Sequence, residues 1–164
     1  GDTSVHEYPT SEQMAEMAIS TARVVRLFGF DPKVAFVSHS TFGQPLTSRT
    51  KHIRNAVDIL KEKKVDFEFD GDMQPDVALN PEYEELYPFS KIVGRANILI
   101  MPGQHSAAIS YKIMKTLGDT KVIGPLLIGL GLPIEITPLR SSTSEIINLA
   151  SIAAYSADVI DYKK

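Results

Sequence analysis

Short apolar runs alternate along this sequence with longer segments of helical periodicity, and that alternation restricts the possible folds more than any other feature. Three apolar runs have the length and the residue types of buried strands, at residues 33–38, 65–69 and 97–101. Beside them, apolar residues recur every three or four positions, as in amphipathic helices, over residues 12–28, 48–64 and 106–117. Strands that alternate with helices form βαβ units. We therefore expect an α/β fold, with a three-layer, mainly parallel or mixed sheet that carries helices on both faces.

Capping residues mark the starts of the first two helices. Thr10 and Gln13 have the spacing of a capping box, and Ser48 is the expected cap of the second helix. These boundaries predict a flexible N-terminal tail over residues 1–9. One domain is expected to follow, over residues 10–164.

Two later segments depart from the simple alternation. Residues 75–94 hold three prolines and an acidic helical turn, which predicts an irregular connection over the surface. Residues 122–139 are the most apolar part of the chain, but glycines, prolines and Glu135 interrupt them, so they do not form a membrane span. We predict two strands there, at 126–130 and 134–139.

The last predicted helix begins near Thr143 and continues past Tyr155, with an alanine-rich face. That face consists of Ile146, Ile147, Ala150, Ala153, Ala154, Ala157 and Ile160. Its small residues suit close packing against a second subunit, while ordinary packing of a helix on a sheet explains the same pattern. We expect a homo-oligomer, at least a dimer.

Composition excludes several functional classes. Seventeen basic and twenty acidic residues give a net charge of −3, which leaves no electrostatic footprint for nucleic acid. The chain has no cysteine, so disulfide scaffolds, cysteine nucleophiles and thiolate metal sites are excluded. The four histidines do not have the spacing of a metal motif. Because the N-terminus lacks a basic, signal-like segment, we expect a cytoplasmic protein with no membrane partner.

Polar residues follow each of the three predicted strands, where open parallel sheets bind their ligands. These residues are Ser38, His39, Ser40, Thr41 and Gly43 after the first strand, Asp70, Gly71, Asp72 and Gln74 after the second, and Gln104, His105 and Ser106 after the third. Hydroxyls and glycine amides near helix N-termini suit phosphate groups. Arg54 or Lys112 would help to hold such an anion. The usual nucleotide fingerprints, GxxxxGK[ST] and GxGxxG, are absent.

Each of these signals also has a structural interpretation. Asp70-Gly71-Asp72 taken alone favours a simple turn, and His39 and His105 are compatible with ordinary polar loops. Arg140, together with Ser141, Ser142 and Thr143, either fixes a phosphate or belongs to the cap of the last helix. Arg140 joins the proposed cleft only if the final strand runs parallel to the first three.

Five ordered motifs resemble the phosphate acetyl/butyryl transferase family. They are VAFVSHSTFG at 34–43, DGDMQ at 70–74, ANILIMP at 96–102, IGPLLIGL at 123–130 and IIN at 146–148. They resemble the family's VAxLSxSxxG, DGExQ, ANVLxxP, IGPxLxGL and IVN elements. The order and spacing agree over roughly residues 10 to 160, and such a resemblance implies the family's α/β fold.

Further stretches resemble one branch, the phosphotransacetylase-like C-terminal region of large bacterial malic enzymes. They are DFEFDG at 66–71, ALN at 78–80, LYPF at 86–89, HS at 105–106 and NLASIAAY at 148–155. The resemblance implies a regulatory domain that senses acetyl-CoA and is attached to an NADP-dependent decarboxylating malate dehydrogenase. NADP and a divalent metal would then belong to a catalytic part outside this chain. A complete family region is about twice this long, so the chain resembles its second half.

The resemblance also implies where acetyl-CoA binds. The candidate ligand residues are Ser38, His39, Ser40, Thr41, Gly43, Arg54, Gln104, His105, Ser106, Lys112, Arg140 and Thr143. True phosphotransacetylases carry an SRGxSxxD-like element before the last helix, whereas this chain has LRSSTSE at 139–145. Arg140 stands for the arginine and Glu145 for the acid, but Leu139 replaces the serine. This departure favours binding without turnover, and an active acyl-phosphate transferase or a purely oligomerising domain are the alternatives.

Overall fold

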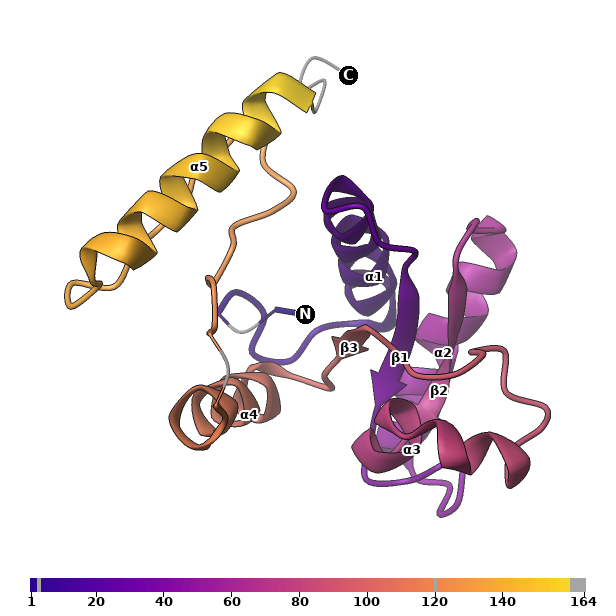
Figure 1. Ribbon diagram of the computed structural model, residues 1–164. Helices are drawn as coiled ribbons and strands as arrows, with labels where there is room; N and C mark the ends of the chain where they lie inside the picture. Colours follow the sequence, from indigo (N-terminus) through magenta and orange to yellow (C-terminus); the bar gives the residue numbers. More distant parts are fainter. Residues whose placement is uncertain (3, 120, 160–164) are drawn as a thin grey trace. The chain divides into compact units, whose positions relative to one another are not determined.

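A computed structural model describes residues 1–2, 4–119 and 121–159 of the chain. The chain divides into two compact units, Gly1–Tyr111 and Lys112–Lys164 (Figure 1).

The first unit is built on a parallel sheet of three strands, β1 (Lys33–Val37), β2 (Glu68–Met73) and β3 (Ile98–Ile100). The strand order is β2-β1-β3, so β1 is the central strand (Figure 1). Val34 pairs with Phe69 on one side and with Ile98 on the other, both in parallel register. The predicted α/β class and the parallel direction of these strands are confirmed.

Helices α1 (Ser11–Leu27) and α2 (Ser48–Lys63) pack against each other and cover one face of the sheet. Val34 and Phe36 of β1 point into the core on this side, because alternate strand residues face opposite sides. The helices supply the opposing apolar surface through Met14, Ala18, Ile53, Ala56, Val57 and Leu60. The apolar faces predicted from the helical periodicity are therefore the buried ones.

The opposite face of the sheet is covered by a smaller layer. Ala35 of β1 lies there in a second core cluster with Met73, Ala78, Ile92 and Ala96. Ala78 belongs to a short helix, α3 (Pro75–Leu79), which is followed by the 3₁₀ helix η1 (Pro81–Glu85). The acidic helical turn predicted within residues 75–94 is confirmed by η1, and the predicted surface connection also buries Ala78 and Ile92 against the sheet.

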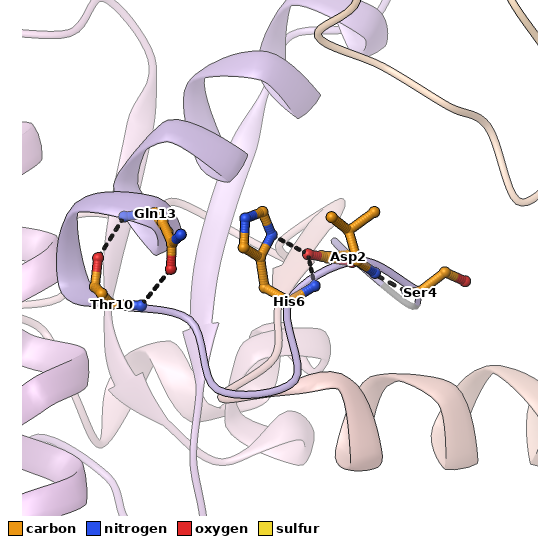
Figure 2. Close-up of polar contacts among 6 residues, drawn as sticks. Asp2, Ser4, His6, Thr10 and Gln13 are labelled. Atoms are coloured by element: carbon orange, nitrogen blue, oxygen red, sulfur yellow. Dashed lines mark hydrogen bonds and ion pairs between the residues drawn. The ribbon is translucent and has the colours of Figure 1, made fainter.

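The N-terminal end of α1 is fixed by reciprocal hydrogen bonds (Figure 2). The Thr10 hydroxyl accepts from the Gln13 N–H at 3.2 Å, and the Gln13 side chain accepts from the Thr10 N–H at 2.8 Å. The predicted capping box is confirmed. Upstream, the Asp2 carboxylate accepts backbone N–H groups from Ser4 at 3.0 Å and from His6 at 2.9 Å. Flexibility of the tail stays a prediction.

Two predicted boundaries shift in the structure. Thr47, not Ser48, caps α2, because its extended backbone lets the hydroxyl accept from the Thr50 N–H at 3.2 Å. Strand β2 begins at Glu68 rather than at residue 65 and extends through Met73. The turn predicted for Asp70-Gly71-Asp72 is therefore wrong, since all three residues lie within β2.

The register between β1 and β2 explains this shift. Gly71 pairs with Phe36 at a φ of +154°. A Cβ on residue 71 would lie 2.7 Å from the Phe36 Cβ, which is closer than real Cβ contacts. Glycine thus lets β2 approach the bulky central strand, and the apparent turn signal serves sheet pairing instead.

The second unit holds α5 (Thr143–Val159) and an apolar segment that contains no strand. Helix α4 (Gln104–Leu117) runs from the first unit into the second along the chain. The strands predicted at 126–130 and 134–139 were wrong. Pro138 lacks the N–H that a sheet ladder needs, and a strand also requires a partner strand.

The predicted alanine-rich face of α5 is largely exposed over the described residues. Leu149 is buried, whereas Ile146 and Ile147 are 48% and 58% exposed. Ile160 lies outside the described residues. Since the second unit has no strand among its described residues, α5 does not pack on a sheet of that unit, and self-association through it stays a prediction.

We expect Leu60→Ala to lower the free energy of unfolding by about 2–5 kcal/mol, because it leaves a cavity between α2 and the sheet. Glu62→Ala, at an exposed position of the same helix, is the control and should change it by less than about 0.5 kcal/mol. Urea denaturation followed by far-ultraviolet circular dichroism measures both. Equal effects of the two substitutions would contradict the assigned core.

Glu145 should titrate at unusually low pH. Its carboxylate accepts from the Ser142 N–H at 2.8 Å and lies 3.0 Å from the Lys115 Nζ, and these contacts lower its pKa to about 2. An unfolded glutamate has a value of 4.5. The contribution to stability is therefore complete above pH 4.5 and is lost as the pH falls toward 2. A carboxyl ¹³C titration should show Glu145 still ionised at pH 3; a midpoint near 4.5 would contradict the cap.

Candidate functional site

The loop that follows β1 lies at the carboxyl edge of the sheet, and most of its residues are buried. Ser40 is completely inaccessible, and Ser38, Thr41 and Gly43 are also buried, whereas His39 is exposed. We call residues 38–43 the β1 loop. Because β1, β2 and β3 are parallel, the segments that follow all three strands lie at the same edge.

A bulge in β2 turns Asp72 toward the β1 loop. Phe36 pairs with Gly71 and the next residue of β1, Val37, pairs with Met73, so Asp72 is the extra residue of the bulge. Its side chain is fully buried. One carboxylate oxygen, Oδ1, accepts from the Gly43 N–H at 3.0 Å, and Oδ2 accepts from the Ser40 hydroxyl.

Backbone hydrogen bonds strengthen this connection between the β1 loop and β2. The Phe42 N–H donates to the Asp72 carbonyl oxygen at 2.6 Å, and the Ser38 N–H donates to the Met73 carbonyl at 2.9 Å. In return, the Gln74 N–H donates to the Thr41 hydroxyl at 3.2 Å. The β1 loop is therefore held in one conformation by β2 and by the residue that follows it.

Asp70 performs a similar task for a different segment. Its carboxylate accepts the Lys91 N–H at 2.8 Å and the Gly71 N–H at 2.9 Å. Lys91 adjoins Ile92, which is part of the second core cluster. Sequence analysis placed Asp70 and Asp72 among the polar residues after the second strand but not among the acetyl-CoA ligand residues; the available signal was two acids, two positions apart, at the end of an apolar run.

Arg54 brings a cation to the β1 loop. Gly43 has a φ of +80°, and a Cβ on that residue would lie 2.6 Å from Nη1 of Arg54. Glycine thus leaves room for the exposed guanidinium against the loop backbone. With the exposed imidazole of His39, Arg54 gives this edge two side chains suited to an anionic ligand.

The residues that follow β3 contact the N-terminal segment. The Gln104 N–H donates to the Glu7 carbonyl oxygen at 3.2 Å, and the exposed His105 lies 3.6 Å from the Glu7 carboxylate. The Ser106 hydroxyl donates to the Gly103 carbonyl at 2.9 Å. The backbone of Gln104 and the hydroxyl of Ser106 thus stabilise the start of α4.

Three predicted site residues, Lys112, Arg140 and Thr143, belong to the second unit and are exposed. The cap of α5 is formed by Ser142 and Glu145, whose N–H donates to the Ser142 hydroxyl at 3.3 Å. Of the two roles proposed for the serines near Arg140, capping is therefore the one that Ser142 performs.

The described residues contain no group of three or more histidine or acidic side chains placed to hold a metal ion. Among the helices described, none combines the length and apolar character needed to cross a bilayer. The carboxyl edge itself carries hydroxyls, an imidazole and a guanidinium beside a buried carboxylate.

Residues 1–154 match the family model described as phosphate acetyl/butaryl transferase. Similar curated proteins include an NADP-dependent malic enzyme of Rhizobium meliloti, 47% identical over 95% of this chain but 20% of that enzyme. A phosphate acetyltransferase of Bacillus subtilis is 35% identical over 95% of the chain and 49% of the relative. The chain thus spans about a fifth of the first protein and about half of the second.

Solved structures agree with these sequence matches. A phosphotransacetylase from Streptococcus pyogenes superposes with a TM-score of 0.91 at 35% identity, over 96% of this chain and 48% of that one. The EutD phosphotransacetylase from Staphylococcus aureus gives a TM-score of 0.87 at 32% identity, over 96% and 49%. The motifs, the parallel fold and the family match lead to one conclusion: the chain belongs to the phosphate acetyl/butaryl transferase family.

Proposed function

We propose that this chain is an acetyl-CoA-sensing regulatory domain of an NADP-dependent malic enzyme. One observation carries the proposal: the chain is 47% identical over 95% of its length to a malic enzyme of which it covers only 20%. The remaining length of such a protein would hold the part that decarboxylates malate, together with NADP and a divalent metal. This chain would supply the effector site.

The carboxyl edge of the sheet is a suitable place for that effector. The phosphates of CoA are anionic, and Arg54 places a guanidinium against the β1 loop while His39 remains accessible. Hydrogen bonds to β2 hold the loop in place. A preformed loop lowers the ordering cost of binding.

The element before α5 favours sensing over catalysis. Leu139 stands where the family motif has a serine, and its apolar side chain is fully exposed. An apolar residue there supplies no hydroxyl for an acyl-transfer step, which depends on placed hydrogen-bond donors. Binding would persist without transfer of the acetyl group.

Regulation of this kind has a reciprocal consequence. If acetyl-CoA changes the affinity of the enzyme for malate or NADP, these ligands must change the affinity for acetyl-CoA by the same factor. The effector acts only if it binds one state of the protein more tightly than the other.

The first test is calorimetric titration of acetyl-CoA into the malic enzyme that carries this chain, together with NADP reduction rates measured with and without acetyl-CoA. We expect saturable binding and a changed rate of malate oxidation. Arg54→Gln should weaken acetyl-CoA binding about fivefold, because an exposed charge contact contributes about 1 kcal/mol.

Arg23→Gln is the matched control, since Arg23 is an exposed arginine of α1. It lies in the half of the helix that leads to the amino end of β1, away from the carboxyl edge. The affinity of the Arg23→Gln variant for acetyl-CoA should be the same as that of the wild type. Absence of binding at millimolar acetyl-CoA, or equal losses in both variants, would contradict the proposal.

An active phosphate acetyltransferase is the second candidate, favoured by the 35% identity to the Bacillus subtilis enzyme. It predicts that the protein carrying this chain forms acetyl phosphate from acetyl-CoA and inorganic phosphate. We expect no acetyl phosphate above the rate without protein, because Leu139 replaces the motif serine. A colorimetric hydroxamate assay measures the product, and turnover that is abolished by Arg140→Gln would favour the transferase instead.

A further inference from the structure

The hydrogen bonds of the β1 loop can be assigned donor by donor. The Ser40 hydroxyl has one proton and donates it to Asp72 Oδ2, while the Gly43 N–H donates to Asp72 Oδ1. Neither group has a second proton to offer. Both are buried, so a ligand outside the loop meets no free donor on Ser40 or Gly43.

Ser38 continues the same chain of hydrogen bonds. Its hydroxyl oxygen lies 3.2 Å from that of Ser40, and either oxygen can be the donor on distance alone. Since the only hydroxyl proton of Ser40 goes to Asp72, Ser38 must be the donor to Ser40. The result is a buried relay from Ser38 through Ser40 to Asp72.

The buried carboxylate is balanced by these donors rather than by a cation. Among the ion pairs formed by the described residues, none involves Asp72. A carboxylate in a fully buried position is costly unless it accepts hydrogen bonds. The β1 loop therefore gives to Asp72 the kind of donors that phosphate-binding loops give to phosphate.

We propose that Asp72 acts as an internal anion, which occupies the donors of Ser40 and Gly43 and makes these two residues positioning residues. Contact with an anionic ligand is then made by the exposed Arg54 and His39. The part of this proposal that concerns the ligand rests on the function proposed above.

If the ligand rather than Asp72 used the donors of Ser40 and Gly43, removing the Asp72 charge would change the ligand affinity in the opposite direction. In that case the Asp72 carboxylate and the anionic ligand would compete for the Ser40 hydroxyl and the Gly43 N–H. Removal of the Asp72 charge would then tighten the binding of an anion. If Asp72 holds the loop in place, the same removal weakens binding, because Gly43 and the Arg54 beside it lose their fixed position.

Asp72→Asn is the decisive variant, since the amide keeps the size of the side chain and removes its charge and one acceptor oxygen. In the 164-residue chain, we expect hydrogen exchange of the Gly43 amide to rise by about tenfold, because its N–H then donates at best to a neutral amide oxygen instead of a charged carboxylate. The Gly29 amide, bonded to the Arg26 carbonyl at the end of α1, is the internal reference and should not change.

Affinity for acetyl-CoA is the second readout. We expect Asp72→Asn to weaken it at least about threefold, whereas Asp76→Asn, which removes the same charge from an exposed position on α3, should leave it unchanged. Tighter binding by Asp72→Asn, or unaltered Gly43 exchange, would overturn the proposal. If wild type itself binds no acetyl-CoA, the proposed function fails, while Gly43 exchange still decides the role of Asp72.

If Asp72→Asn does not fold, Ser40→Ala is a second variant that tests whether Asp72 holds the β1 loop in place. It removes one hydroxyl from the relay and leaves the Gly43 hydrogen bond to Asp72 in place. We expect Gly43 exchange to rise about threefold as Asp72 loses one of its two anchors. Unchanged exchange in this variant would also overturn the proposal.

Discussion

The contact between Phe36 and Gly71 is the constraint on which the rest of the first unit depends. It fixes the register of β2 on the central strand, because no side chain fits at position 71. With that register set, the bulge leaves Asp72 without a register partner in β1 and directs its carboxylate to the β1 loop. One close approach between two strands thus determines both the packing of the sheet and the shape of the edge where a ligand would bind.

The neighbouring Asp70 and Asp72 show how a polar motif can serve structure and site together. Asp70 holds the segment that precedes β3 through the Lys91 N–H, and Asp72 holds the segment that follows β1. Both carboxylates accept N–H groups from loops that have no ladder partner of their own. Loops fixed in this way present their exposed side chains from a rigid base.

Local patterns predicted what depends on local interactions. The capping box at Thr10 and the buried face of α2 follow from residues three or four positions apart, and the structure has both. The extent of β2 depends on Phe36, more than thirty positions away along the chain, so the local turn signal at 70–72 was misleading. The apolar residues at 126–139 have the composition of strands. A strand forms only beside a pairing partner, however, and Pro138 cannot donate a hydrogen bond to one.

The difference between local and long-range interactions also explains why the sequence predicted the position of the candidate site but not its hydrogen bonds. Hydroxyls and glycines after a strand correctly indicate a loop at the carboxyl edge, but they do not reveal which donors are already used. An effector can shift an equilibrium only through groups whose contacts differ between two states. Groups that already donate to Asp72, such as the Ser40 hydroxyl and the Gly43 amide, are poorly suited to that role. The exposed Arg54 and His39 have the freedom to respond, so a response to acetyl-CoA would begin with these two side chains.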